Sequence, residues 1–311
     1  MTDLNFIALD CEWVNNNKDV CEIGITKVTK GNIIYSRKWL ILPQTNDTKL
    51  LDSDKCKISE YDIYDAPTFA EVWDDIVSHI ENNVIICHNA KSADMDCLVK
   101  MLCKYNINNI PNFIFLCSCR FAESAGFLGR SSLSTLCSEY GISQSNHHEA
   151  MDDTISCAKV FIECYKEIGI PFNDIVNNQG ESFKDYYDKR IYEIQPTDCT
   201  YVNILDINSS CCYNLFEDFK FCLTGKTFKY GKFLTNRLIH KLGGKILQDV
   251  RKKNLPDIVI YSNGYENSGK VQRARQSNIQ HIISEDKLFE YISTNKVPII
   301  KNDNNDLFSL L

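Results

Sequence analysis

The sequence of 311 residues predicts two α/β units, a mixed five-stranded sheet flanked by helices and then a smaller unit with a parallel four-stranded sheet. Two observations support this prediction. In the first half, three strand-like segments precede strands that alternate with helices, which is the order of a mixed sheet. After a stretch without clear periodicity, strands and helices alternate again, which is typical of a parallel sheet.

In the first unit, short apolar and β-branched runs bounded by turn residues predict the strands, and apolar residues at helical spacing predict the helices. The segment "PTFAEVWDDIVSHIEN", for example, opens with Pro and repeats Phe69, Val72, Ile76 and Ile80 on one helical face. Strands are predicted at 5–13, 20–29, 32–43, 83–90 and 113–119. Helices are predicted at 67–82, 94–105, 132–141 and 149–169.

The second unit follows a segment whose hydrophobic pattern has no clean period. Strands are predicted at 219–225, 245–250, 257–262 and 281–284, and helices at 233–244, 269–279 and 285–293. We therefore expect a first domain over 1–170, a linker over 171–215, a second domain over 216–294 and a flexible tail over 295–311.

The composition is ordinary for a globular protein, with 44% hydrophobic and 24% charged residues. The sequence lacks an uncharged apolar run of about 18 residues, and its start lacks a basic region and a long apolar core. We therefore expect a cytoplasmic protein without a membrane partner. The 15 scattered cysteines lack zinc-site spacing, and a reducing compartment with buried thiols is favoured over a disulfide framework.

The net charge of −7 is unevenly distributed. Residues 219–311 carry 16 Lys and Arg against 8 Asp and Glu, whereas the preceding residues carry 18 against 33. This asymmetry indicates two units with different partners, and the basic segment is suited to phosphate. A solvated basic face without a ligand explains the charge almost equally well.

Asp10 and Glu12 interrupt the apolar run "IALDCEWV". Side chains two positions apart on a strand point to the same face, so the two carboxylates project together. Adjacent ionised carboxylates repel each other and resist burial, and a hard divalent cation such as Mg²⁺ resolves the conflict. The alternative is an edge strand whose polar face lies in water.

Two further acids begin predicted helices. Asp94 follows the buried strand "VIICHNA", and Asp153 lies five residues after His148 in "HHEAMDD". If these acids converge with the first pair, they form a site for two metal ions of the kind that cleaves phosphodiesters. His148 then suits the role of general base, because the ordinary pKa of a histidine side chain lies near neutrality. Each acid alone also fits a helix cap or a surface position.

The segment with Asp10 and Glu12, the strand followed by Asp94, and the segment with His148 and Asp153 form three motifs. In this order they resemble the motifs of the DnaQ-like, or DEDDh, 3′–5′ exonucleases over about residues 5–165. The resemblance implies a ribonuclease H-like fold. It also implies that Asp10, Glu12, Asp94 and Asp153 bind two divalent cations, Mg²⁺ or Mn²⁺, and that His148 is the base. The family's motif spacing favours Asp94 over Asp96, Asp153 over Asp152 and His148 over His147.

Three further residues are candidates for substrate contact. Trp13 stands where the family usually has Thr, and it is either a stacking platform for a base or a packed aromatic. His88 and Asn89 end a strand and are either positional or substrate-binding. The second motif is one residue longer before Asp94 than is usual in the family.

Residues 216–294 resemble a BRCT domain of the bacterial DNA ligase type. The resemblance rests on Thr224-Gly225, on Gly243-Gly244 and on "HIISEDKLFEYI", with Phe289 in place of the customary Trp. It implies that Thr224, Gly225 and Lys270 bind a phosphate of a DNA end or a phosphorylated partner, since a hydroxyl, an amide and an ammonium form an anion site.

Taken together, the sequence predicts a metal-dependent exonuclease that releases nucleoside monophosphates from single-stranded 3′ ends, with DNA favoured over RNA. Two other interpretations stay open. One is an exoribonuclease that trims RNA or short oligonucleotides. The other is a non-catalytic scaffold that binds DNA ends or phosphorylated partners through the BRCT domain.

Overall fold

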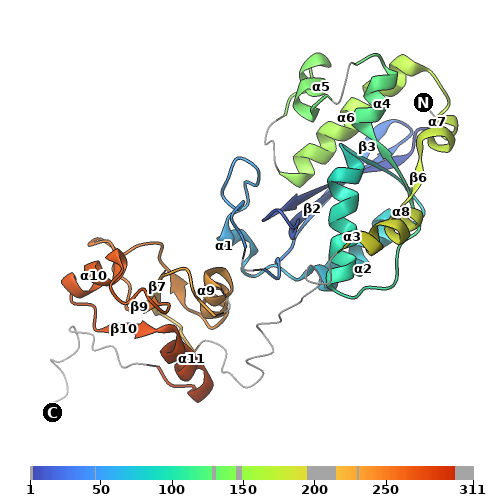
Figure 1. Cartoon of the computed structure of the whole chain (residues 1–311). Coiled ribbons are helices and arrows are strands. Elements are labelled where there is room, and N and C mark those ends of the chain that lie inside the picture. The colour runs from blue at the N-terminus through green and yellow to red at the C-terminus, as the bar shows by residue number, and fades with distance from the viewer. Residues whose placement is uncertain are drawn as a thin grey trace, which may run out of the picture. The chain divides into compact units, whose positions relative to one another are not determined.

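The computed structural model describes residues 3–45, 47–127, 131–144, 149–194, 215–229 and 231–297, without the side chains of 233 and 234. The chain divides into two compact units, Met1–Val202 and Asn203–Leu311. Each unit contains its own sheet and is described by itself (Figure 1). Within the described residues, every helix is too short or too polar to cross a bilayer.

The sheet of the first unit has the strand order β3-β2-β1-β4-β5-β6. The strands are β1 Phe6–Trp13, β2 Val20–Thr29, β3 Asn32–Leu40, β4 Val84–Cys87, β5 Ile114–Cys117 and β6 Glu181–Ser182. β1, β2 and β3 are antiparallel and β1, β4 and β5 are parallel, so the predicted mixed sheet is confirmed. The prediction of five strands was wrong by one, because the two-residue β6 is too short to leave a periodic pattern.

Helices cover both faces of this sheet (Figure 1). They are α1 Glu60–Ile63, α2 Phe69–Ile80, α3 Asp94–Lys104, α4 Ser118–Ser124, α5 Leu133–Glu139, α6 Ala150–Ile168, α7 Phe172–Gln179 and α8 Phe183–Arg190, with 3₁₀ turns η1 Ala90–Ser92 and η2 Ile191–Glu193. Side chains of β1 alternate between the faces: Ile7 and Leu9 pack with α2, α3 and α8, whereas Phe6 and Ala8 pack with α4, α5, α6 and α7.

Residues 172–194 were expected to belong to a linker that starts at position 171, but they form helices that pack into the first unit. α7 buries Phe172 and Ile175 in one core, and α8 buries Phe183 and Tyr187 in the other. The Asn, Asp and Lys residues between these positions hide the helical period in the sequence. The rest of the expected linker, 195–214, and the expected tail from 298 lie outside the described residues.

β2 and α6 meet through their backbones at Gly24. A Cβ atom at this position would lie 2.5 Å from the carbonyl carbon of Ala150 and 2.8 Å from the amide nitrogen of Met151. Any side chain here would therefore displace the backbone of one of the two elements. The contact places the first turn of α6 directly beside the strand that pairs with β1.

The second unit is a four-stranded sheet with helices between its strands. Its elements are β7 Lys220–Thr224, α9 Lys232–Lys241, β8 Lys245–Ile246, β9 Ile258–Tyr261, α10 Gly269–Gln276, β10 His281–Ser284 and α11 Glu285–Thr294. The strand order is β10-β9-β7-β8 and every pairing is parallel, which confirms the predicted parallel sheet. Phe221, Ile258 and Leu288 belong to its main core.

Candidate metal centre

Three acidic side chains meet on the face of β1 that also carries Phe6 and Ala8. Asp10 and Glu12 share this face because they lie two and four residues after Ala8 on one strand. Asp153 comes from the first turn of α6. The carboxylate oxygens of Asp10, Glu12 and Asp153 lie within 4.8 Å of one another, so the structure brings these three predicted residues together.

Asp94 lies beside this cluster. It begins α3, is only 1% exposed, and its Oδ1 accepts a hydrogen bond of 3.0 Å from the backbone N–H of Cys11, the residue between Asp10 and Glu12. Its Oδ2 is buried without a hydrogen-bond partner within the described part of the chain. A buried carboxylate oxygen without a partner is unfavourable in free energy and is readily explained by a bound cation.

The raised pKa values show that the ionised form of these carboxyl groups is disfavoured in the folded protein. Burial, followed by the negative charge of Asp94, raises the pKa of Asp10 well above its ordinary value. Burial raises the pKa of Glu12 to about 9 and that of Asp94 to about 7, although the N–H of Cys11 opposes the shift at Asp94. The donor set is therefore all oxygen, and ionising it fully requires a positive charge, so the residues fit a hard divalent cation.

This arrangement predicts how thermal stability depends on pH and metal. The carboxyls of Glu12 and Asp94 hold protons in the metal-free folded state that the unfolded chain releases. The free energy of unfolding in EDTA should therefore decrease as pH rises from about 5 to about 9. A cation that replaces those protons should raise Tm, and more at pH about 8 than at pH about 6. Thermal unfolding with and without Mn²⁺ measures both effects.

The matched control for this prediction is Asp10→Asn, which keeps the side-chain volume and removes one charged ligand. We expect its metal-induced shift in Tm to be much smaller than that of the wild type. Equal shifts for the two proteins would contradict the site.

Sequence reasoning missed the residues that hold the start of α6. Glu22 lies directly opposite Glu12 across the β1–β2 pair, and its Oε2 accepts a 2.8 Å hydrogen bond from the N–H of Ala150. The ammonium of Lys38 lies 3.0 Å from Oε1 of Glu22 and also pairs with Glu149. The available signal was the single Glu in the otherwise apolar run "VCEIGI".

The neighbouring acids and histidines have different surroundings. Asp96 forms ion pairs with Lys18 and Arg190, each at 2.8 Å, which accounts for it without a metal. Asp152 is half-buried in the same turn as Asp153. His148, the predicted base, and its alternative at position 147 lie outside the described residues, so the role of His148 stays a prediction.

Two of the candidate substrate contacts have structural partners at the end of β4. Nε2 of His88 donates a hydrogen bond of 3.0 Å to the carbonyl oxygen of Ser131, and Nδ1 lies 2.9 Å from the hydroxyl of Ser118. Burial lowers the pKa of His88, in agreement with a neutral ring held between these groups. Asn89 has a left-handed φ of 66° and accepts a hydrogen bond of 2.7 Å from Ser92 within η1.

Trp13, the third candidate, follows an irregularity in the β1–β2 register. It is half-buried against the core, and its ring centroid lies 5.7 Å from the ammonium of Lys18. These contacts agree with a packed aromatic. Base stacking by Trp13 and substrate contact by His88 and Asn89 stay predictions.

In the second unit, two of the three predicted phosphate ligands lie near the start of α10. The hydroxyl of Thr224, at the end of β7, donates to Oγ of Ser268, the N-cap of α10, at 3.1 Å. Lys270 lies in the first turn and donates to the carbonyl oxygen of Gln248. Gly225 has a φ of 123°, which disfavours a side chain.

Comparison with known proteins finds a family model that matches much of the first unit. Residues 7–161 match the family model described as "Exonuclease". The chain is 23% identical over 313 residues to a DNA polymerase III PolC-type of Thermotoga petrophila, covering 97% of this chain and 21% of that protein. It is also 27% identical over 169 residues to the 3′–5′ exonuclease DinG of Staphylococcus epidermidis, covering 52% of this chain and 18% of that protein.

The chain thus spans about a fifth of the length of the curated relatives it matches. Among solved structures, Exonuclease X in complex with 5′ overhanging duplex DNA is similar with a TM-score of 0.45 and 18% identity, over 55% of this chain and 97% of that one. E. coli Exonuclease I in complex with a dT13 oligonucleotide is similar with a TM-score of 0.45 and 13% identity, over 55% and 43%.

Proposed function

We propose, from the premise that residues 7–161 are an exonuclease domain, that the protein is a metal-dependent exonuclease that removes nucleoside monophosphates from the 3′ ends of single-stranded DNA. The family match confirms the coarser prediction that the chain carries an exonuclease, a hydrolase. The observation that carries the proposal is the convergence of Asp10, Glu12 and Asp153 within 4.8 Å, with buried Asp94 beside them.

In the mechanism, these four carboxylates would hold divalent cations, Mg²⁺ or Mn²⁺. When bound, the cations act as Lewis acids that stabilise negative charge on the phosphodiester oxygens. The chain itself sets the geometry: β1 fixes Asp10 and Glu12, and Glu22 fixes the turn of α6 that carries Asp153. We assign His148 as the general base that takes the proton from the attacking water, which requires the neutral imidazole.

The names of the relatives support the direction and the nucleic acid. A DNA polymerase III PolC-type and a 3′–5′ exonuclease DinG favour DNA and 3′–5′ digestion, and with them a role in repair or proofreading in the cytoplasm. Because the first unit is acidic, we expect substrate binding to depend on the metals rather than on the net charge of its surface.

A second function is favoured by two observations on the second unit. Its parallel four-stranded sheet, and Thr224 bonded to the N-cap of α10, support the proposed BRCT domain over 216–294 with an anion site at Thr224, Gly225 and Lys270. We propose that this unit binds a phosphorylated group, either a DNA end or a protein. In a scaffold without catalysis, this binding would be the protein's whole activity.

The test uses single-stranded DNA and RNA of one sequence, labelled at either end, with Mg²⁺, Mn²⁺ or EDTA. We expect 5′-labelled DNA to shorten stepwise only with metal, and 3′-labelled DNA to release its label first. Faster digestion of RNA would favour the exoribonuclease, and binding without cleavage under any metal would favour the scaffold.

A further inference from the structure

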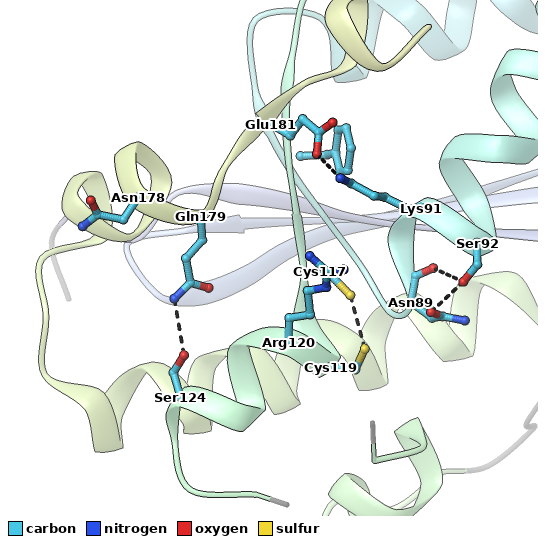
Figure 2. Close-up of a pocket in the computed structure, with 11 residues that line it drawn as sticks. Asn89, Lys91, Ser92, Cys117, Cys119, Arg120, Ser124, Asn178, Gln179 and Glu181 are labelled. Atoms are coloured by element: carbon cyan, nitrogen blue, oxygen red, sulfur yellow. Dashed lines mark hydrogen bonds and ion pairs between the residues drawn. The ribbon is translucent and has the colours of Figure 1, made fainter. Parts of the chain in front are cut away.

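Two cysteines of the first unit lie in contact with each other, outside the group of converging carboxylate oxygens. Cys117 ends β5 and Cys119 lies in the first turn of α4, and their Sγ atoms are 3.3 Å apart (Figure 2). Both cysteines line a cavity of about 590 Å³ together with Asn89 and Arg120, but Cys119 is only 2% exposed whereas Cys117 is half-buried. A small reagent can therefore reach Cys117 first.

The sulfur of Cys117 is surrounded by hydrogen-bond donors. It accepts the S–H of Cys119 and the backbone N–H groups of Arg120, Ala90 and Asn89, and these bonds lower the pKa of Cys117 to about 5. The fully buried Cys87 and Cys157 differ, because burial raises the pKa of both. Backbone N–H groups that converge on one atom form an anion site, and here the anion is the chain's own thiolate.

The charged groups around this site come from several elements. Arg120 lies on α4, Lys91 on η1 is paired with Glu181 of β6, and His88 at the end of β4 is held neutral by its two partners. The negative charge of Cys117 also raises the pKa of Asp94. These charged groups do not explain why the two sulfur atoms lie in contact.

We propose that Cys117 is a redox-active thiolate and Cys119 its resolving thiol, so that a hydroperoxide that enters the cavity converts the pair into a disulfide. The Cys117 thiolate attacks the peroxide, forming an S–O bond, breaking the O–O bond and, after one proton is taken up, releasing water or an alcohol. The Cys119 thiol then attacks the sulfenic sulfur, the S–S bond forms, and its proton leaves with the hydroxyl as water. Sulfur loses two electrons in total, and the peroxide gains them.

The expected consequence for the nuclease rests on the function proposed above. A neutral disulfide sulfur accepts hydrogen bonds less strongly than a thiolate, so the N–H groups of Asn89 and Ala90 lose their charged partner. These residues begin η1, the turn that leads directly into Asp94 and α3. Oxidation should therefore disturb the position of Asp94 and lower exonuclease activity reversibly.

The chemistry can be tested without measuring activity. The tryptic peptide 105–120 contains Cys117 and Cys119 and no other cysteine. We expect iodoacetamide to label Cys117 at pH about 6 about tenfold faster than Cys103, which is also half-buried. After hydrogen peroxide, mass spectrometry should show this peptide lighter by two hydrogen atoms and resistant to alkylation until dithiothreitol is added.

Two variants complete the test. Cys119→Ser should stop at the sulfenic acid and never form the disulfide, whereas Cys103→Ser should behave as the wild type. A peptide that stays reduced, or a Cys117 that reacts no faster than Cys103, would overturn the proposal. Nuclease activity of the reduced protein is measured separately, so its absence would refute the proposed function while the thiol results still stand.

Discussion

Asp10→Ala is expected to lower the rate of 3′-end digestion by about 10³-fold or more while the fold stays intact. Asp10 is one of the three converging carboxylates, and losing it would remove a proposed ligand to a Lewis acid that stabilises the transition state by several kcal/mol. Single-turnover digestion of labelled single-stranded DNA measures the rate. Circular dichroism and Tm in EDTA check the fold, and Tm should be equal or higher because the variant lacks a carboxyl whose ionisation is disfavoured by burial and by its acidic neighbours.

The matched control is Asp152→Ala. Asp152 lies next to Asp153 on α6 but is half-buried and outside the group of converging oxygens. We expect this variant to keep activity within a few-fold of the wild type. If Asp10→Ala digests DNA at the wild-type rate, the cluster is not the catalytic centre.

His148→Gln is expected to lower kcat by about 10²- to 10⁴-fold, the range that general-base catalysis contributes. A base must be unprotonated to accept a proton, so the wild-type rate should rise with pH through about 6.5 and then level off. The variant should lack this rise. A pH–rate profile for both proteins, at saturating metal, shows the difference.

Two controls distinguish loss of the general base from loss of the metal site. The metal-induced rise in Tm should persist in His148→Gln, because the cations are proposed to bind the four carboxylates and His148 is proposed to act only as the base. His147→Gln should behave as the wild type. A pH rise that is retained in His148→Gln and lost in His147→Gln would assign the role to the neighbour.

Much of the site could be predicted because its residues belong to strongly periodic elements. The apolar run around Asp10 and Glu12 forms β1, and the segment with a long apolar face after Asp153 forms α6, as predicted. The contacts through which Glu22 and Lys38 hold the start of α6 could not be predicted. They depend on the strand register and on a helix that begins 128 residues after Glu22 in the sequence. The donors around Cys117 come from two separate elements, α4 and the start of η1, and no local pattern joins them.

The same reasoning explains the errors in the fold. β6 has only two residues, and its strand character comes entirely from pairing with β5. α7 and α8 are rich in polar residues, and each buries only two apolar side chains, so tertiary packing rather than intrinsic pattern decides that they are helical.

The backbone contact at Gly24 has a consequence for how this protein can change over evolutionary time. Because no side chain separates β2 from α6 at this point, a residue larger than Gly24 has no space into which its side chain could turn. A replacement there moves the first turn of α6, which carries Asp153. A core position can absorb a change of size when its neighbours repack, but the backbone contact at position 24 has no side chain that could do so. Over evolutionary time, this glycine should therefore tolerate less change than the apolar residues of the core around it.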